Sequence, residues 1–355
     1  MKPVPVAELR TFVLQVLETC GLSRADAETT ADVLVTTDTW GVFTHGTKAL
    51  YAYTRRLRAG GLKADGRPRV DREGPGWAVV DGDSAIGMVT AVYAMRLAMA
   101  KAAQAGIALV AVHNTCHFGA AGYYASQAAD EGKLAIVVSN DVPSVAAPGS
   151  RGPVLGSNPF AFGAPGGSEG PMVLDISTAE VAGGKVAAAA AEGKRIPESW
   201  LVDSEGRPAG DPNLFLQGKA SLAPMAGHKG YGLALMIEIL SGALSGSSMR
   251  NEVGIWMREP LGKPTGHGQA FLAIDPAVFL GTERFTSRME ELFGSIRSGP
   301  SVAGVDHVKI PGEIERDKRQ RSLSHGIDFP DEVLKLLHVA AEENNCPVPS
   351  FLGQA

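Results

Sequence analysis

The sequence predicts an α/β protein in which a central α/β domain is flanked by helical segments from both ends of the chain. Apolar residues recur at helical spacing near both termini, and short apolar runs of strand length alternate with helical stretches in between. The composition is that of a packed fold, since 45% of the 355 residues are hydrophobic and 43 are glycine. We therefore expect residues 1–73 and 306–355 to form a helical domain and residues 74–305 to form an α/β domain.

Three helices are expected near the N-terminus. The first has an apolar face and ends at Gly21; that face consists of Leu9, Phe12, Val13, Val16 and Leu17. Ser23 and Asp26 resemble a capping box at the start of the second helix. Thr44 is a suitable N-cap for the third helix, which would end at Gly60–Gly61 and turn Leu50, Tyr53 and Leu57 inward.

The middle of the chain alternates between strands and helices. Strands are expected at Ala78–Val80, Ile107–Val112, Leu134–Val138, Phe160–Gly163, Met172–Ile176 and Ala270–Ile274. Helices are expected at Met88–Ala105, Ala121–Glu131 and Lys229–Gly242. The strand–helix–strand spacing predicts a parallel βαβ unit. A final helix would have Pro330 as its first residue.

Composition also argues against several classes of function. The 33 basic and 38 acidic residues give a net charge of -5, which leaves no broad basic field for nucleic acid. Neither a signal peptide nor an apolar run of the roughly 20 residues that cross a bilayer is evident. The three cysteines, Cys20, Cys116 and Cys346, are widely spaced, as in a reducing compartment. We expect a cytoplasmic protein with no nucleic-acid or membrane partner.

The segment His113–Gly122 is the first candidate site, because it joins the end of a predicted strand to the start of a helix. Ligands of open α/β sheets bind at this edge, where helix amides can meet an anion. A tight turn with a hydrogen-bonded histidine is the alternative. His113 and His117 could also bind zinc, but they span a strand-to-turn junction and no HExxH motif is present.

Two lysines at predicted helix starts suggest a bound phosphate. Lys229 lies in Gly227–Gly232, and Lys185 follows Gly183–Gly184. A lysine at the positive end of a helix dipole is unfavourable unless an anion offsets it. His45 could exchange a proton near neutral pH, although an exposed histidine at a helix cap is the better explanation of this motif taken alone. No GxGxxG follows a strand, so an ordinary Rossmann domain is not expected.

As a set, these motifs resemble the type-2 malate/L-lactate dehydrogenase family, whose relatives include ureidoglycolate dehydrogenase, diketogulonate reductase and piperideine-2-carboxylate reductase. The resemblance covers nearly the whole chain through HFGAAG, GSNP, DISTA, PESWLVD, GHKGYG and Pro311-Gly312-Glu313. It implies a non-Rossmann α/β domain that binds NAD or NADP, a helical domain made from both chain ends, and a homodimer. The implied substrate is a small 2-hydroxy or 2-oxo acid.

The same resemblance assigns roles to particular residues. His45 corresponds to the proton donor, Thr44 to a supporting serine, and His117 to a histidine with a catalytic or a cofactor-binding role. The implied cofactor-binding residues are His117, Phe118, Gly119, Ala120, Ala121, Asn140, Ser157, Asn158, Asp175, Ile176, Ser177, His228, Lys229, Pro311, Gly312 and Glu313.

This chain departs from the family pattern at positions that the resemblance assigns to substrate binding. The arginine that clamps the substrate carboxylate is replaced by Ala49, and arginines common in relatives are replaced by Trp40 and Gly183. Lys48 is adjacent to Ala49 but would point about 100° away on a helix. Lys185 is therefore the candidate for the missing cation, and loss of a bidentate arginine is not a conservative change.

The leading hypothesis is an NAD(P)-dependent oxidoreductase that acts on a CH–OH group, with His45 as proton donor or acceptor. A reductase of cyclic imino acids or of sugar-derived keto acids is an alternative within the family. A metal-dependent hydrolase that uses His113, His117 and His45 is an alternative from another class. The replaced arginines also allow a cofactor-binding protein that has lost catalysis.

Overall fold

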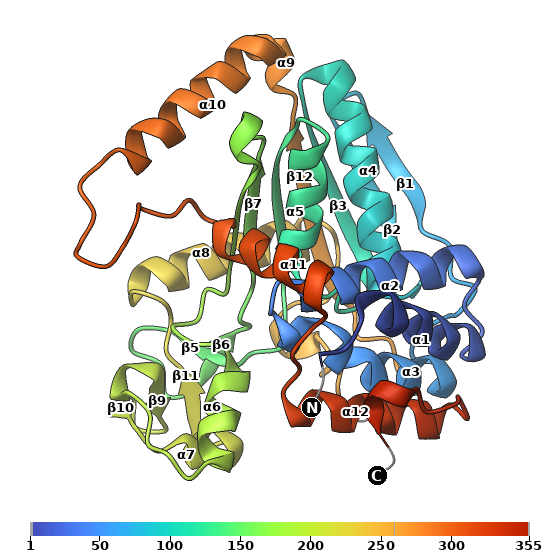
Figure 1. The fold of residues 1–355 in the computed structure, drawn as a ribbon. Coiled ribbons are helices and arrows are strands. Elements are labelled where there is room, and N and C mark those ends of the chain that lie inside the picture. Colours follow the sequence, from blue (N-terminus) through green and yellow to red (C-terminus); the bar gives the residue numbers. More distant parts are fainter. Residues whose placement is uncertain (1–2, 259, 354–355) are drawn as a thin grey trace.

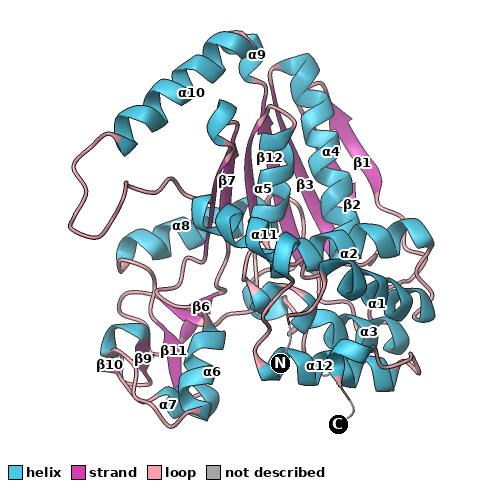
Figure 2. Ribbon diagram, viewed as in Figure 1, coloured by secondary structure: helices cyan, strands magenta, loops and turns pink. Residues whose placement is uncertain are grey.

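The computed structural model describes residues 3–258 and 260–353, which form a mixed α/β fold with two sheets. The larger sheet is drawn in Figures 1 and 2 behind helices α4 and α5. Its seven strands lie in the order β1 (Arg69–Gly74), β2 (Trp77–Asp81), β3 (Ile107–Thr115), β12 (His267–Ile274), β4 (Leu134–Ser139), β7 (Phe160–Ala164) and β8 (Met172–Ile176). All six strands expected from the sequence are therefore present.

The pairing of these strands differs in part from the expectation. β2 and β3 pair in parallel through helix α4 (Gly87–Ala105), which is a βαβ unit. β3 and β4 are joined by helix α5 (Ala121–Asp130), but β12 lies between them and pairs antiparallel with both. β3 and β4 are therefore parallel to each other within one sheet, as the predicted βαβ unit requires, but they are not neighbours, because a strand more than a hundred residues later in the chain lies between them.

Side chains of the large sheet alternate between two buried layers. Val137 and Phe271 belong to the core that includes α4 and α5. Val138 and Ala270, their chain neighbours, pack instead with Ile237 of α8 (His228–Glu238). Because successive strand residues point to opposite faces, helices cover both faces of this sheet. Helix α8 continues as a π-helical segment, Ile239–Ala243, close to the end predicted from the sequence.

Helices from the two ends of the chain pack together. The N-terminal helices are α1 (Val6–Thr19), α2 (Arg24–Thr39) and α3 (Leu50–Ala59), and the C-terminal helices are α11 (Glu313–His325) and α12 (Asp331–Glu343). Val4 and Ile327 exchange two backbone hydrogen bonds of 2.9 Å, and α12 contacts α3. Figure 1 shows both termini beside this group. The same core continues into α4 and α5, so the division at residues 73/74 and 305/306 stays a prediction.

The third helix begins later than expected. Two 3-10 turns, Phe43–His45 and Thr47–Ala49, precede α3, and Thr44 caps no helix. The cause is Asp38, whose Oδ2 accepts hydrogen bonds from the Thr47 amide at 3.0 Å and from the Thr47 hydroxyl at 2.5 Å. Pro330 likewise precedes α12 as its N-cap instead of forming its first residue.

The second sheet was not expected, because its strands are only two or three residues long. They lie in the order β10 (Pro208–Ala209), β9 (Leu201–Asp203), β11 (Ala220–Leu222), β5 (Val145–Ala146) and β6 (Pro153–Leu155). Helices α6 (Gly183–Ala191) and α7 (Pro212–Leu216) accompany it, as Figure 1 shows. Val186 and Leu201 lie in its own small core. Such short strands carry no readable period.

The remaining elements lie at the edges of the fold. They are the 3-10 turns Gly167–Glu169, Glu198–Trp200, Arg250–Glu252 and Ser350–Leu352, and helices α9 (Pro276–Phe279) and α10 (Thr282–Arg297). Within the described residues, no helix combines the length and the apolar character needed to cross a bilayer.

Candidate active site

His45 and His117 lie side by side, although 72 positions separate them in the chain; their ring centroids are 5.5 Å apart. His45 comes from the 3-10 turn before α3, and His117 from the turn after β3. The carbonyl oxygen of His45 also lies near Gly119, where an added Cβ would be 3.5 Å away. Two imidazoles at the carboxyl end of a sheet strand form the centre of the candidate site.

The His117 ring is held by contacts on several sides. Its Nδ1 lies 2.6 Å from the Tyr53 hydroxyl and 3.4 Å from the Gly119 amide, which donates to it. Its face stacks on Trp256, with centroids 4.1 Å apart and planes 12° apart. Trp256 also stacks on Tyr53 at 5.1 Å. An aromatic wall therefore sets the orientation of His117.

Trp256 lies on a loop that the buried Arg56 holds in place. The guanidinium donates hydrogen bonds to five backbone carbonyls, those of Ile255, Trp256, Arg258, Leu261 and Lys263. Arg56 is 1% exposed. Charge-assisted hydrogen bonds of this kind compensate the desolvation of a buried guanidinium. Arg56 was not expected at the site, because nothing in a single sequence separates it from the more exposed arginines beside it, Arg55 and Arg58.

Both histidines favour the neutral form. Burial lowers the pKa of His117 well below its ordinary value, and the neighbouring His45 and His267 add to this effect. Burial also lowers the pKa of His45, and the carboxylate of Asp141 opposes part of that change. The pair therefore contains neutral imidazoles at neutral pH, each able to donate one hydrogen bond and accept another.

Asp141 and His267 form a second polar pair beside the histidines. His267 Nε2 lies 3.3 Å from Asp141 Oδ1, and His267 Nδ1 lies 2.8 Å from the Thr265 hydroxyl. The Val142 amide donates to the same Asp141 oxygen at 2.8 Å. Asp141 is thus an oriented negative charge that acts on His45. Neither residue was expected from the sequence. Asp141 follows β4, and His267 begins β12, which pairs with β4 but lies far from it in the chain.

Thr44 and the start of α6 meet at the open side of the site. The Thr44 hydroxyl lies 2.9 Å from His45 Nδ1. A Cβ on Gly184 would lie 3.3 Å from Cγ2 of Thr44, so the first turn of α6 adjoins the His45 turn. Lys185, next to Gly184, has an exposed side chain. The sequence-predicted group of His45, Thr44, His117 and the segment bearing Lys185 is therefore brought together.

Neither Lys48 nor Ala49, in the 3-10 turn before α3, directs a free cation toward this region. Ala49 is buried at 3% exposure, and Lys48 Nζ pairs with Glu332 of α12 at 2.8 Å. That ion pair turns Lys48 toward α12. Gly183 borders Phe215, which a Cβ would touch at 3.4 Å.

The start of α5 adjoins the end of β8. The Gly122 amide donates to Asp175 Oδ2 at 2.8 Å, and a Cβ at Gly122 would collide with that carboxylate. Removal of water from the Asp175 carboxyl raises its pKa to about 6, and Glu315 adds repulsion. Ala120 and Ala121 begin α5, and Phe118 is buried against Tyr124.

Other candidate cofactor residues are engaged within the protein. The Asn140 side chain is buried and bonds the backbone of Ser248 and Gly268. Asn158 is also buried, and its amide group donates to Ala234 and Glu238. These two side chains shape the loops, so any contact of theirs with a cofactor would be indirect.

The loop at the end of β8 is tied to the loop that contains Ser157. The Ser177 hydroxyl and the Thr178 amide both donate to the Ser157 carbonyl, at 3.2 and 3.0 Å. Ile176 is the last residue of β8. The next loop is connected as well, because the Met225 amide donates to the Thr178 carbonyl at 2.9 Å. Asp175, Ser177 and the start of α8 therefore follow one another along a single border of the fold.

The first turn of α8 is open to solvent. His228 and Lys229 are exposed, and no side chain caps this helix. Gly227 has a φ of 65°, and a Cβ there or at Gly232 would have no neighbour within 4 Å in the described structure. Exposed amides, a lysine and open space together can accept an anion.

The Pro311–Gly312–Glu313 loop lies against β8. The Val173 amide donates to the Pro311 carbonyl at 3.0 Å, and Gly312 adopts a φ of 89°. Glu313 accepts hydrogen bonds from four groups: His307, Lys309, Arg297 and the Ile310 amide. These donors hold the pKa of Glu313 well below its usual range. The carboxylate therefore anchors its own loop.

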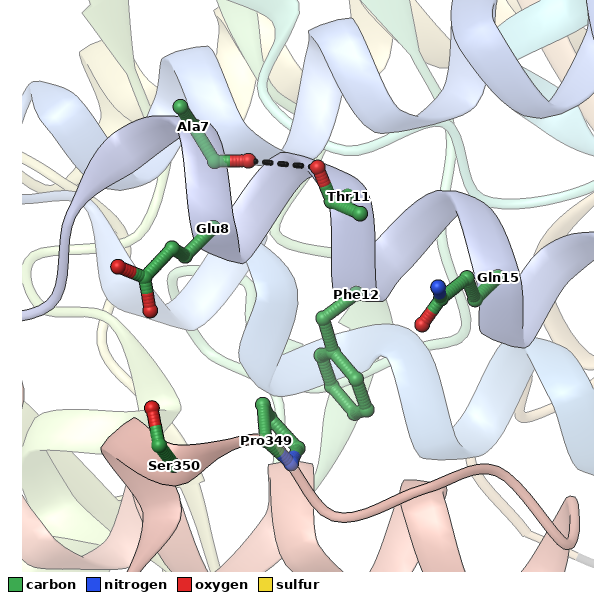
Figure 3. Close-up of a pocket in the computed structure, with 7 residues that line it drawn as sticks. All are labelled: Ala7, Glu8, Thr11, Phe12, Gln15, Pro349 and Ser350. Carbon is green, nitrogen blue, oxygen red and sulfur yellow. Dashed lines mark hydrogen bonds between the residues drawn. The ribbon is translucent and has the colours of Figure 1, made fainter.

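Two other features offer less to a reaction. His113 pairs with Asp71 of β1 at 2.7 Å, so one of its ring nitrogens is already engaged, and no group of three metal-ligating side chains occurs among the described residues. A pocket beside α1, shown in Figure 3, is lined by Ala7, Glu8, Thr11, Phe12, Gln15, Pro349 and Ser350. The Thr11 hydroxyl there is already bonded to the Ala7 carbonyl at 2.9 Å. Neither feature provides a nucleophile–base pair.

Comparison with known proteins finds similar sequences over nearly the whole chain. A sequence model described as malate/L-lactate dehydrogenase matches residues 4–338. A malate/(S)-sulfolactate dehydrogenase of Methanothermus fervidus is 36% identical over 342 residues, which cover 95% of this chain and 97% of the relative. A ureidoglycolate dehydrogenase (NAD(+)) of Escherichia coli K12 is 33% identical and covers 89% of each chain.

Two further matches are a relative that is named for a different substrate class and a solved structure with a similar fold. A Δ1-pyrroline-2-carboxylate/Δ1-piperideine-2-carboxylate reductase of Pseudomonas putida is 32% identical over 94% of this chain and 95% of the relative. The solved structure of sulfolactate dehydrogenase from Methanocaldococcus jannaschii superposes with a TM-score of 0.89 and 32% identity. It covers 97% of this chain and 98% of that one.

Proposed function

This chain belongs to the malate/L-lactate dehydrogenase family of oxidoreductases, and on that premise we propose that it interconverts a small 2-hydroxy acid and the matching 2-oxo acid with NAD or NADP. The observation that carries the proposal is the His45–His117 pair, with ring centroids 5.5 Å apart, at the carboxyl end of β3. The reaction class is oxidation of a CH–OH group and its reverse.

The residues of the candidate cofactor region fit a dinucleotide. Exposed amides of α8 with His228 and Lys229 suit a pyrophosphate, because the helix dipole and a lysine both attract negative charge. Gly119, with a φ of 78°, allows backbone to approach a ligand beside His45. When bound, the nicotinamide would accept or supply the hydride.

The side chains of this chain would handle the proton. His45 would take the hydroxyl proton during oxidation and return it during reduction, because its pKa lies below the ordinary histidine value and it is mostly neutral at pH 7. Thr44 would hold His45 Nδ1, and Asp141 would stabilise the imidazolium that forms. Exclusion of water by Trp256 and Tyr53 would strengthen these interactions.

Lys185 would bind the substrate carboxylate in place of an arginine from the third helix. Its helix start adjoins Thr44, while Ala49 carries no charge and Lys48 is paired with Glu332. A single ammonium offers a point charge where an arginine would offer two parallel hydrogen bonds. A substrate class that differs from malate, such as cyclic imino acids or sugar-derived keto acids, is the alternative that this change favours.

The test is oxidation and reduction assayed at 340 nm with both cofactors on 2-hydroxy acids, 2-oxo acids, cyclic imino acids and sugar-derived keto acids. We expect turnover with at least one acid, lost by a factor of about 100 or more in His45→Ala. Tight cofactor binding without turnover of any compound would favour the protein that has lost catalysis. Hydrolysis that a chelator abolishes would favour the metal-dependent alternative.

We also propose a cytoplasmic homodimer. The outer side of α8 and the segment after it expose seven large apolar side chains: Leu235, Met236, Ile239, Leu244, Met249, Ile255 and Met257. Apolar surface of this extent commonly marks an interface. The free thiols of Cys20, Cys116 and Cys346 suit a reducing compartment. Light scattering that gives the 37.0 kDa monomer mass at micromolar concentration would contradict the dimer.

A further inference from the structure

The hydrogen bonds around His117 determine which ring nitrogen carries its proton. The Tyr53 side chain is fully buried, and burial raises its pKa well above the ordinary value, so the phenol keeps its proton. The hydroxyl lies 2.6 Å from Nδ1 of His117, and the Gly119 amide, which can only donate, also acts on the phenol oxygen. Tyr53 therefore donates to Nδ1 of His117.

A second donor points at the same nitrogen. The Gly119 amide is an obligatory donor, and it lies 3.4 Å from His117 Nδ1. A nitrogen that faces two donors must present its lone pair to them. The ring proton of neutral His117 therefore resides on Nε2, for which the described residues provide no hydrogen-bond partner.

We propose that Tyr53 is a positioning residue that keeps His117 as a neutral Nε2–H donor, so that His117 donates a hydrogen bond to the substrate without giving up its proton and His45 alone transfers the proton. The last clause rests on the proposed function, whereas the tautomer does not. A neutral imidazole that only donates can polarise a carbonyl group, while protonation of both rings would place two like charges side by side.

The surroundings of His117 support a fixed neutral ring. Trp256 stacks on one face at 4.1 Å, and Arg56 holds the Trp256 carbonyl at 2.6 Å, so rotation of the His117 ring would break a stacked contact. The positive charge of Arg56 is stabilised by hydrogen bonds to backbone carbonyls. Among the described residues, the titratable groups that act on His117 are Tyr53, which keeps its proton, and His45 and His267, which both disfavour protonation of His117.

His45 has a different environment. Its Nδ1 faces the Thr44 hydroxyl, which can donate or accept, so either tautomer and the protonated ring are compatible with that contact. Asp141 favours the charged form of His45. The two histidines therefore differ: the proton of His117 is fixed on one ring nitrogen, whereas His45 can gain and lose a proton.

The direct test is ¹⁵N NMR of the histidine rings in the cofactor-free protein, with the His117 signals assigned by their loss in His117→Gln. We expect an unprotonated Nδ1 and a protonated Nε2 on His117, unchanged between about pH 5 and pH 8. A protonated Nδ1, or titration of this ring within that range, would overturn the proposal. This measurement needs no turnover, so it tests the tautomer of His117 even if the proposed function is wrong.

Tyr53→Phe supplies the second test, with Tyr51→Phe as its matched control. Tyr51 lies on the same helix and contacts Arg55 by a cation–π interaction. Tyr53→Phe should give mixed tautomers or a titrating ring at His117, and should lower kcat about tenfold with little change in KM. Tyr51→Phe should resemble the wild type in both the His117 spectrum and the kinetic constants. An unchanged His117 spectrum in a folded Tyr53→Phe protein would overturn the proposal, and the wild-type spectrum decides alone if that variant does not fold.

Discussion

The Arg56 guanidinium donates a 2.6 Å hydrogen bond to the backbone carbonyl of Trp256, whose ring stacks on His117. This contact joins the third helix of the chain to a loop 200 positions later, and it connects a buried structural charge to a candidate catalytic ring. The geometry of the site therefore depends on a residue that touches neither histidine.

Replacement of Arg56 by alanine should impair both stability and activity. Five carbonyls would lose their donor, and we expect the free energy of unfolding to fall by about 2–4 kcal/mol. Urea denaturation followed by fluorescence measures this change. Arg55→Ala is the matched control, because that arginine forms a partly exposed ion pair with Glu343 and should cost about 1 kcal/mol or less. Equal effects of the two variants would refute the role of Arg56.

Gly46→Ala should displace His45. An added Cβ would lie 1.9 Å from Asp38 Oδ1, inside a fully buried region, so either the turn or the carboxylate must shift. We expect kcat/KM to fall by a factor of about 100 with a stability loss of about 1–3 kcal/mol. Gly152→Ala should be neutral, because a Cβ there meets no atom within 4 Å in the described structure. Full activity in Gly46→Ala would show that the turn is not needed.

Asp38 should make stability depend on pH. Burial raises its pKa to about 7, so the folded protein keeps the proton while the unfolded chain loses it near pH 4. The stabilisation is complete below the unfolded pKa and is lost as pH rises toward about 7, by up to about 4 kcal/mol. The free energy of unfolding of the wild type relative to Asp38→Asn should therefore decline between about pH 4 and pH 7. A constant difference across that range would contradict the assignment.

Lys185→Met should weaken substrate binding more than the chemical step. If Lys185 holds the carboxylate, KM for the acid substrate should rise about tenfold with little change in kcat. Lys194→Met is the control, since Lys194 is exposed and pairs with Glu192 after the same helix. Steady-state kinetics with the preferred acid measure both constants. An unaltered KM would assign the carboxylate to another group.

Lys229→Met should raise the dissociation constant for the reduced cofactor about tenfold and make binding less sensitive to salt, because an exposed ammonium attracts a pyrophosphate through a screened charge. Fluorescence titration of NADH and NADPH at two salt concentrations measures this. Lys219→Met, at another exposed lysine, is expected to leave the constant unchanged. A normal constant in Lys229→Met would remove this lysine from the cofactor site.

Local sequence patterns predicted most single elements. Ser23 accepts the expected hydrogen bond from the Asp26 amide at the start of α2, and Gly60 ends α3 in the left-handed conformation. These features depend on residues within one or two turns of each other, so spacing alone reveals them. The predicted start of α3 was wrong because the Thr47 amide donates a hydrogen bond to Asp38, nine positions earlier in the chain.

The sequence by itself determined the strand and helix periods and the family to which the motifs belong. Tertiary structure alone decided that β12 separates β3 from β4, and that Tyr53, Arg56 and Trp256 surround His117. The physical reason is the range of the interactions. Periodicity records which face of an element is buried, whereas the proton position on His117 depends on donors brought from distant parts of the chain by packing.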